Sequence, residues 1–366
     1  MTPARAQPRL RLALRLAGGG RATRRLMTGG DDKDPLWSRA PAALKTEVAR
    51  LLDDEVPRVM DWLKKEGWRW LVPGDDGYPP GLEHTADPPL GLFVRGELRA
   101  APVVAVVGSR RATAYGLQVA RMLAEELARA GVVVASGMAR GVDAAAHEGA
   151  LAVGGQTWAV LGTGPDRVYP PEHGELSRAI AGAGALLTEY LPGTGPRKHH
   201  FPERNRVLAG LASAVIVVEA AARSGALITA RIAVDEGREV LAVPGSILSD
   251  FSVGPNTLLR LGARPLLTPR DVFAAIGVEA PAPGSEAEVD HPLLDHLPAG
   301  THAAVDELVS RSGMSVAEVH AAILELELEG EVERLPDGSY QRRRAPTPAV
   351  RPAAKTSRGG GPRENT

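Results

Sequence analysis

Five short apolar runs, each followed by a turn and, for most, a stretch of helical character, constrain the fold of this chain more than any other feature. The runs are VVAVV, VVVAS, TWAVLG, AVIVVE and EVLAVPG, all between residues 103 and 245. Helices are expected among them at residues 115–130, 142–153, 204–212 and 226–236. Continuous apolar strands that alternate with helices are typical of a parallel sheet covered on both faces. The pattern therefore predicts an α/β fold with an extended, doubly wound, mostly parallel Rossmann-like sheet that ends near residue 276.

The segments on either side of this core have different patterns. The first 72 residues contain amphipathic helical stretches such as ALKTEVARLLDDEVPRVMDWLKKEG, and the passage VPGDDGYPPGLEHTADPPLGLFVRGEL indicates an extended connector with turns. Near the C-terminus, a capping box from Ser315 to Glu318 opens a helix, and two short strands flank Asp337-Gly338, which indicates a winged helix. The expected domains are a helical N-terminal region of SAM or helix-hairpin-helix type (1–72), the Rossmann-like core with its lead-in (73–276), a linker (277–290), a winged-helix domain (291–342) and a disordered basic tail (343–366).

The charge balance and the absence of cysteine exclude several classes of function. Lysine and arginine number 43 against 44 acids, so only a local cluster of cations can support nucleic-acid binding. The lack of cysteine excludes disulfides, thiolate metal sites and a cysteine nucleophile. No run approaches the roughly 20 apolar residues that span a bilayer, so we expect a cytoplasmic protein without a membrane partner. The arginine-rich first 27 residues indicate a basic helix or, alternatively, a transit peptide.

The turns after the strands are the candidate binding sites. In an open α/β sheet, ligands bind beyond the carboxyl ends of the strands, and small-residue turns there expose backbone N–H groups that suit anions. Any single turn is equally well explained by the tight connections that a parallel fold needs. Five turns on one edge, with Arg110, Arg140 and Arg223 among them, favour an extended phosphate-binding surface. The turns are Gly108–Arg111, Ser136–Gly141, Gly162–Gly164, Arg223–Gly225 and Pro244–Ser246.

The stretch KHHFPERNRVLAG, residues 198–210, concentrates positive charge before a buried strand. We expect Pro202 at the first position of a helix, because its missing N–H costs nothing there. Arg204 and Arg206 then lie near the first turn, where the helix dipole disfavours each cation by roughly 0.3–1 kcal/mol. A bound polyanion would remove this conflict, and Phe201 offers a face on which a base could stack.

An alternative explanation remains open for these arginines. They could pair with nearby acids such as Glu203 and Glu189 and carry no ligand.

Familiar enzyme motifs do not occur in the chain. The stretch GSRRATAYG lacks the spacing of the dinucleotide fingerprint, and neither a phosphate-binding P-loop nor a G-x-S-x-G elbow is present. Adjacent His199 and His200 have no third ligand at metal spacing, so we expect no metal and no other cofactor. Asp143, Glu189 and Glu219 fit turn caps or ion pairs better than general bases. We therefore expect no catalytic residues.

Several ordered motifs resemble one known family. VVGSR, SGMARGVDAAAH, TEY followed by KHHFPERNRVLAGLASAVIVVEA, SGALITA, GREVLAVPG and SVGPNTLLRLGA together resemble the DNA-processing protein A family, also called DprA or Smf. The resemblance covers residues 75–276. It implies a single-stranded DNA-binding protein of natural transformation that protects incoming DNA, helps to load the RecA recombinase, works as a homodimer and is not an enzyme.

The resemblance also implies a set of DNA-binding residues. Arg110 and Lys198 would each grip a backbone phosphate, and Phe201 would lie beside a base. The remaining members would line or floor the same basic pocket. The full set is Gly108, Ser109, Arg110, Ser136, Gly137, Arg140, Gly141, Lys198, Phe201, Arg204, Asn205, Arg206, Ser224, Gly225 and Asn256.

Two features qualify this interpretation. The presumed recognition helix at residues 315–329 is acidic, so we expect the small domain to contact protein rather than DNA bases. The alternative class of function is a nucleotide-processing enzyme such as a phosphoribohydrolase on a similar sheet. Those enzymes have a PGGxGTxxE stretch, and the nearest run, ARSGALITA, lacks its consecutive glycines and its glutamate.

Overall fold

The computed structural model describes residues 3–18, 40–280, 291–297, 301–329, 332–335 and 338–342. The chain forms two compact units, Met1–Ala280 and Pro281–Thr366. Most of the predicted linker, Asp337 of the predicted hairpin and the predicted basic tail lie outside the described residues.

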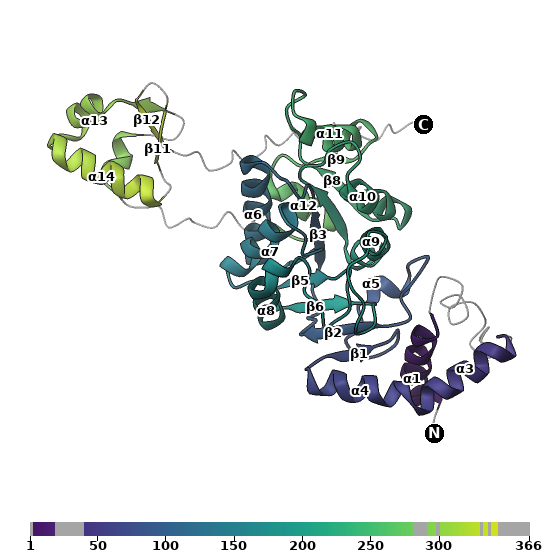
Figure 1. The fold of residues 1–366 in the computed structure, drawn as a ribbon. Coiled ribbons are helices and arrows are strands. Elements are labelled where there is room, and N and C mark those ends of the chain that lie inside the picture. Colours follow the sequence, from purple (N-terminus) through teal and green to yellow (C-terminus); the bar gives the residue numbers. More distant parts are fainter. Residues whose placement is uncertain are drawn as a thin grey trace, which may run out of the picture. The chain divides into compact units, whose positions relative to one another are not determined.

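The first unit is built around a nine-stranded sheet in the order β1-β2-β6-β5-β4-β3-β7-β8-β9 (Figure 1). The strands β6-β5-β4-β3-β7-β8-β9 of this order run parallel to one another. Strand β2 pairs antiparallel with both β1 and β6. The mostly parallel, doubly wound sheet that the sequence predicts is therefore confirmed. The strands are β1 (Arg69–Leu71), β2 (Leu92–Gly96), β3 (Val103–Val107), β4 (Val133–Ser136), β5 (Thr157–Val160), β6 (Ala185–Thr188), β7 (Ala214–Val217), β8 (Glu239–Ala242) and β9 (Arg264–Pro265).

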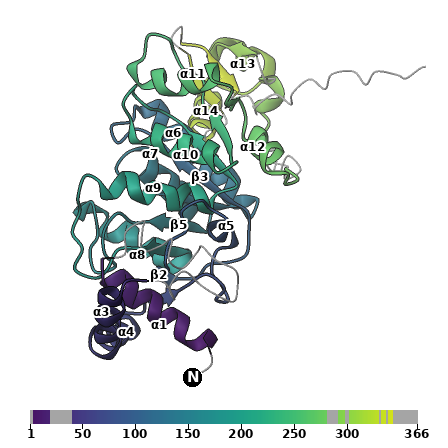
Figure 2. The same ribbon diagram turned by 90° about the vertical axis from the view of Figure 1, so that its right-hand side faces the viewer.

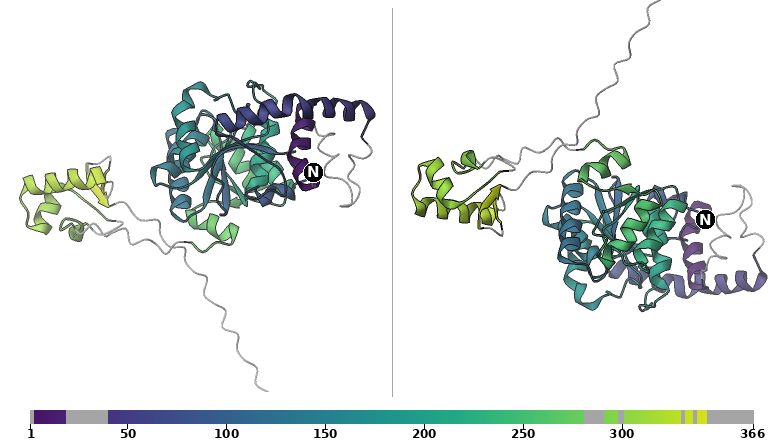
Figure 3. Two further views of the ribbon diagram at one scale, coloured as in Figure 1. Left: turned by 90° about the horizontal axis from the view of Figure 1, so that it is seen from below. Right: turned by 90° about the horizontal axis from the view of Figure 1, so that it is seen from above.

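Helices cover both faces of this sheet (Figures 2 and 3). All five residues of β3 are buried, and alternate ones face opposite layers. Val103 and Val107 pack in the layer that contains α9 and α10, whereas Val104 packs in the layer that contains α6, α7 and α12. The helices are α5 (Pro80–Glu83), α6 (Ala114–Arg129), α7 (Val142–Ala152), α8 (Gly174–Ala183), α9 (His200–Leu211), α10 (Gly225–Asp235), α11 (Val253–Arg260) and α12 (Pro269–Ile276), with the short 3₁₀ helices η2 (Pro171–His173) and η3 (Asp250–Ser252).

The N-terminal helices pack on one end of the sheet. Leu12 and Leu14 of α1 (Pro3–Leu16) are fully buried in a cluster with α3 (Ala42–Asp53), α4 (Glu55–Lys65) and β1. The amphipathic stretch predicted there divides into two helices at Asp54. Pro57 causes this division, because its missing N–H is tolerated in the first turn of α4 but not inside one continuous helix.

Four expectations about the elements were wrong. The lead-in is more than a connector, since it contains α5 and the buried strand β2, and β1 belongs to the sheet although it precedes residue 72. The strand candidates omitted β6. Helix α9 begins at His200 and not at Pro202, so Arg204 and Arg206 lie beyond the first turn. The argument from the helix dipole therefore does not apply to these two arginines.

The second unit is the predicted winged helix. Ser315 and Glu318 form the expected capping box at the start of α14 (Val316–Glu329): the N–H of Ser315 donates to the Glu318 carboxylate over 2.8 Å, and the N–H of Glu318 donates to Ser315 Oγ over 3.3 Å. The hydrophobic core of this unit contains Leu308, Val319 and Leu326. The remaining elements are η4 (Leu294–His296), β10 (His302–Ala303), α13 (Val305–Ser312), β11 (Val332–Arg334) and β12 (Tyr340–Arg342), with a sheet in the order β10-β12-β11. Within the described residues of both units, no helix has the length and apolarity needed to cross a membrane.

Candidate nucleic-acid interface

A small pocket lies at the carboxyl edge of the sheet, where three connections meet. The β3–α6 connection contributes Arg110, the β4–α7 connection contributes three residues, and the segment after β5 contributes two. Phe201 enters from the first turn of α9. The lining residues are Arg110, Gly137, Ala139, Arg140, Tyr169, Pro170 and Phe201. This is the edge on which a parallel α/β sheet binds its ligands.

Phe201 is the centre of the pocket. The Arg110 guanidinium carbon lies 4.9 Å from the centroid of the Phe201 ring, and the Tyr169 ring lies 5.4 Å from it at an angle of 42°. A Cβ on Gly162 would come within 2.9 Å of the Phe201 ring, so this ring rests directly on the backbone at the end of β5. A cation held over an aromatic face gains roughly 0.5–1 kcal/mol at exposed sites. The arrangement therefore places an arginine and two aromatic rings side by side.

The β4–α7 connection passes close to the β3–α6 connection. Gly141 has φ +75°, and a Cβ there would lie 2.2 Å from the carbonyl oxygen of Ser109, so only glycine fits. Met138 has φ 55°, a backbone conformation that costs a non-glycine residue energy. Its carbonyl bonds His173 Nδ1 over 3.0 Å, which ties this connection to η2. Two of the predicted glycine turns thus form one wall of the pocket.

Arg204 lies beneath the pocket and not on its surface. Its side chain is 4% exposed and donates hydrogen bonds to the carbonyls of Gly137, over 2.8 Å, and Val160. Asp143, also buried, accepts hydrogen bonds from the N–H groups of Gly137 and Ala139 over 3.1 and 3.2 Å. Burial lowers the pKa of Arg204 and raises the pKa of Asp143, and the attraction between the two charges opposes both shifts. The structure thus places Arg204 as a support for the pocket wall.

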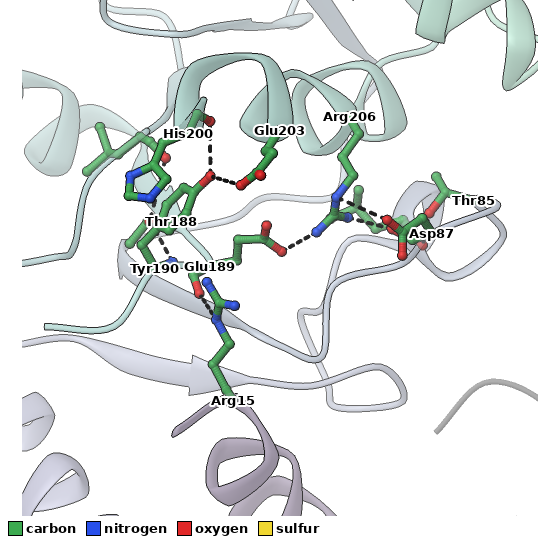
Figure 4. A network of polar contacts seen from close by, with 11 residues as sticks. Arg15, Thr85, Asp87, Thr188, Glu189, Tyr190, His200, Glu203 and Arg206 are labelled. Atoms are coloured by element: carbon green, nitrogen blue, oxygen red, sulfur yellow. Dashed lines mark hydrogen bonds and ion pairs between the residues drawn. The ribbon is translucent and has the colours of Figure 1, made fainter. Parts of the chain in front are cut away.

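Arg206 does not line the pocket and joins an acidic cluster (Figure 4). Its guanidinium pairs with the Glu189 carboxylate and lies 3.6 Å from Asp87 Oδ2. The side chain of Arg206 is 14% exposed and that of Glu189 is 7% exposed. The alternative explanation, pairing with Glu189, therefore describes Arg206.

The segment between β6 and α9, which carries Lys198, is anchored at both ends (Figure 4). The Tyr190 hydroxyl lies 3.0 Å from the carbonyl of His200 and 3.2 Å from Glu203 Oε2, and the Tyr190 ring stacks on the His200 ring at 4.3 Å. Arg15 of α1 donates to the carbonyl of Glu189 over 2.6 Å. Lys198 itself is exposed, three residues before Phe201.

The other predicted residues are divided between the interior and the neighbouring connections. Ser136 is buried and donates to the Val106 carbonyl over 2.6 Å. The amides of Asn205 and Asn256 bond the carbonyls of Gly225 and Gly245, over 3.3 and 3.0 Å. The pocket therefore brings together Arg110, Gly137, Arg140 and Phe201, with Gly108, Ser109 and Gly141 on the adjoining backbone. It does not include Ser136, Lys198, Arg204, Asn205, Arg206, Ser224, Gly225 or Asn256.

Tyr169 is a pocket residue that the sequence reasoning missed. It lies in GTGPDRVYPP, downstream of the glycine turn that ends β5. The same rule that selected the glycine turns, position after a parallel strand, would have selected this aromatic residue.

The switch point of the sheet carries a carboxylate of the protein itself. The strand order reverses between β3 and β7, the place where doubly wound folds commonly bind nucleotides at the N-terminus of the first helix. Here the buried Glu219 carboxylate accepts hydrogen bonds from Thr113 N and Thr113 Oγ1, over 2.9 and 2.6 Å, at the start of α6. A Cβ on Gly116 would lie 2.4 Å from this carboxylate. Glu219 therefore fills the position that a nucleotide phosphate takes in such folds.

Fold and site together define a doubly wound α/β protein with an arginine–aromatic pocket at its carboxyl edge and a separate winged helix. Two family models match these units in turn: DNA recombination-mediator protein A over residues 69–277, and the DprA winged helix domain over residues 278–338. The chain belongs to the DNA recombination-mediator protein A (DprA/Smf) family, as the sequence motifs predict.

Relatives of known sequence and structure agree with this family assignment. The chain is 39% identical over 300 residues to protein Smf of Escherichia coli, and the aligned region covers 78% of this chain and 80% of the relative. It is 39% identical over 314 residues to the putative DNA processing protein DprA of Mycobacterium tuberculosis, with 79% of each covered. The X-ray structure of DprA from Streptococcus pneumoniae matches with a TM-score of 0.60 and 38% identity, over 73% of this chain and 92% of that one. DNA processing protein A of Helicobacter pylori, a structure described for its single-stranded DNA binding mode, matches with a TM-score of 0.52 and 31% identity, over 57% and 94%.

Proposed function

We propose that this protein binds single-stranded DNA through the pocket around Phe201. The observation that carries the proposal is the joint position of Arg110, Phe201 and Tyr169 on the ligand-binding edge of the sheet. Proteins that bind unpaired strands without sequence preference combine cations for the phosphates with aromatic rings for the bases. The described single-stranded DNA binding of the Helicobacter pylori relative supports the same substrate here.

Lys198 extends this site in the proposal. It is exposed on the segment that leads into Phe201, and that segment is fixed at Tyr190 and at His200. A cation on a fixed segment loses less conformational freedom when it binds a phosphate. Arg110 and Lys198 then hold the backbone while a base lies against the rings.

Family membership supports a wider role, which we also propose. We infer that the protein acts in the cytoplasm during natural transformation, protects incoming single strands, helps to load the RecA recombinase and performs no catalysis. If so, RecA filaments should form faster when this protein is added to single strands that are already covered by a single-strand-binding protein. Arg110→Gln should remove this effect. If the protein without substitutions leaves the rate of filament formation unchanged, the loading role is contradicted but the DNA-binding role is not.

We also propose a homodimer, formed at the β9 edge of the sheet. Strand β9 is an edge strand of two residues, and the segments around it carry strongly exposed apolar side chains: Ile247 is 91%, Leu248 92%, Leu261 75% and Leu267 73% exposed. Large exposed apolar side chains that gather at one edge commonly mark an interface. Leu267→Glu should then shift the mass measured by light scattering from dimer to monomer. A dimer that survives this change and Leu261→Glu would exclude the β9 edge.

The acidic winged helix is proposed to contact protein. Glu318, Glu325 and Glu327 of α14 are exposed, together with Leu324, which is 59% exposed. Carboxylates repel phosphates, so this helix is poorly suited to a DNA groove. Replacing Glu325 and Glu327 by glutamine should leave the affinity for single strands unchanged.

A salt series on an unstructured oligonucleotide tests the DNA-binding proposal. Arg110→Gln and Lys198→Gln should each weaken binding by about tenfold or more and lower the slope of log affinity against log salt by about 0.7. The matched control is Arg129→Gln, because Arg129 is also exposed but ends α6 and pairs there with Glu126. If Arg110→Gln binds as tightly as the Arg129 variant, the pocket is not the DNA site, and if Lys198→Gln does so, Lys198 does not extend it.

The nucleotide-processing alternative has a structural argument against it. Glu219 occupies the start of α6, a position at which doubly wound folds commonly bind a nucleotide phosphate. Release of free base from nucleoside monophosphates by the purified chain would nevertheless establish that function and overturn the proposal of a non-catalytic protein.

A further inference from the structure

The two pocket arginines have different partners in the free protein. Arg110 lies over the Phe201 ring, and among the described residues the structure shows no ion pair for it. Arg140 is different, because its guanidinium Nε and Nη2 both contact Oε1 of Glu172, in η2. One lining cation is therefore available to an anion, whereas the charge of the other is already matched by a carboxylate.

Glu172 is held beside Arg140 by the way η2 is attached. The neighbouring His173 bonds the carbonyl of Met138 over 3.0 Å, so η2 and the β4–α7 connection are joined at two adjacent points. Pro170 and Pro171 restrict the backbone on the other side. An ordinary surface pair between two long side chains loses most of its energy to conformational entropy. Here the fixed backbone of η2 keeps the Glu172 carboxylate within reach of Arg140, which lines the pocket.

The pair remains exchangeable. Both side chains are about half exposed, at 58% for Arg140 and 49% for Glu172, so the charges are screened by water and the contact is weak. A phosphate of a bound strand offers Arg140 the same kind of charge-assisted contact.

We propose that Arg140 is a second phosphate subsite of the pocket and that Glu172 is its occupant in the free protein. A backbone phosphate displaces the Glu172 carboxylate from Arg140, and the displaced carboxylate then repels the strand. Glu172 thereby limits affinity for short or weakly charged strands, which engage few phosphates, more than for long ones. This inference rests on the proposed function, because it assumes that the pocket binds a nucleic-acid backbone.

The test compares Glu172→Gln with the parent chain on an unstructured oligonucleotide across a salt series. Glutamine keeps the shape and removes the charge, so we expect about two- to fivefold tighter binding at low salt. The slope of log affinity against log salt should become steeper by about 0.7, since Arg140 then neutralises a phosphate that Glu172 no longer opposes. The advantage of the variant should consequently shrink as salt rises.

Glu175→Gln is the matched control. Glu175 lies in the first turn of the next helix, α8, is 94% exposed and lies 3.8 Å from Arg178, so its replacement removes the same charge from the same region without freeing Arg140. In the Glu172→Gln background, Arg140→Gln should abolish the gain. In the parent background, Arg140→Gln should have a smaller effect, because there the charge of Arg140 is already matched.

The outcomes separate this inference from the function beneath it. If Glu172→Gln binds no tighter than Glu175→Gln, or binds more weakly than the parent, Glu172 does not compete with the strand and the inference fails while the function stands. If the parent binds no oligonucleotide, both fail. Thermal unfolding of each variant shows whether a loss of binding comes from a loss of folded protein.

Discussion

Replacing the buried Arg204 should destabilise the protein without removing a DNA contact. In Arg204→Met, the carbonyls of Gly137 and Val160 lose their donor, and Asp143 loses the cation that offsets its burial. Leaving two buried carbonyls without a donor costs roughly 1–3 kcal/mol each, and the Asp143 charge stays buried without its compensating cation, so we expect a total cost of about 3–5 kcal/mol. For a unit of this size each kcal/mol lowers the melting temperature by roughly 2–4 °C. We therefore expect the midpoint to fall by about 6–20 °C.

A second variant isolates the cause of this loss. Asn at position 143 can still accept from the N–H of Gly137, so Arg204→Met with Asp143→Asn removes the uncompensated charge and keeps that hydrogen bond. The double variant should recover at least about 1 kcal/mol relative to Arg204→Met alone, since uncharged replacements of a buried pair are often nearly neutral. Urea unfolding at one pH and salt concentration measures both differences.

The DNA-binding measurement decides between support and contact. At a temperature where Arg204→Met is folded, its affinity for a single strand should lie far closer to the parent than that of Arg110→Gln. An Arg204→Met protein that melts like the parent but no longer binds DNA would refute the placement of Arg204 beneath the pocket.

Three further outcomes test other parts of the fold and of the site. His147 of α7 is fully buried and does not line the pocket. Burial lowers the pKa of His147 to about 3, so below the ordinary value near 6.5 the unfolded chain takes up a proton that the native chain does not bind. The contribution of neutral His147 to stability should thus be largely present at pH 7, and the free energy of unfolding should fall by roughly 2 kcal/mol between pH 7 and pH 5. His147→Asn should remove this dependence in urea titrations. Gly162→Ala would bring a methyl group within 2.9 Å of the Phe201 ring and should weaken DNA binding severalfold in a filter-binding assay. Gly225→Ala meets nothing within 4 Å, and an equal loss there would show that the strand extends to α10.

The sheet could be predicted because its signal is local. The five apolar runs became β3, β4, β5, β7 and β8, and the helices among them begin or end within a few residues of the expected positions. Strand β2 escaped because LFVRG follows a dense group of prolines and glycines, and its partner β6 lies far along the chain, with Val94 opposite Leu187. A strand pairing between segments so far apart in the chain produces no hydrophobic periodicity in either segment.

The pocket could be predicted in part for the same reason. The carboxyl-edge rule depends only on strand direction, and it brings Arg110, Gly137 and Arg140 together from the order of strands and turns alone. What the rule cannot decide is which face of α9 each arginine occupies. Arg204 bonds carbonyls that lie 67 and 44 positions away in the chain, and these partners exist only after the sheet has formed.

The effective charge of the interface is therefore a property of pairings and not of the number of cations. The cations that the sequence places at the carboxyl edge of the sheet include Arg204, Arg206 and Arg140. The first is buried, the second pairs with Glu189, and the third pairs with Glu172. Within the described residues, the structure shows no ion pair for Arg110 or for Lys198. Counterion release on DNA binding depends on these two charges first, so the salt dependence of the parent chain should correspond to fewer phosphates than the sequence suggests. Displacement of Glu172 from Arg140 alone predicts three neutralised phosphates, a slope of about 2.1, whereas a slope of about 2.8, for four phosphates, would show that the strand also breaks the pair of Arg206 as it binds.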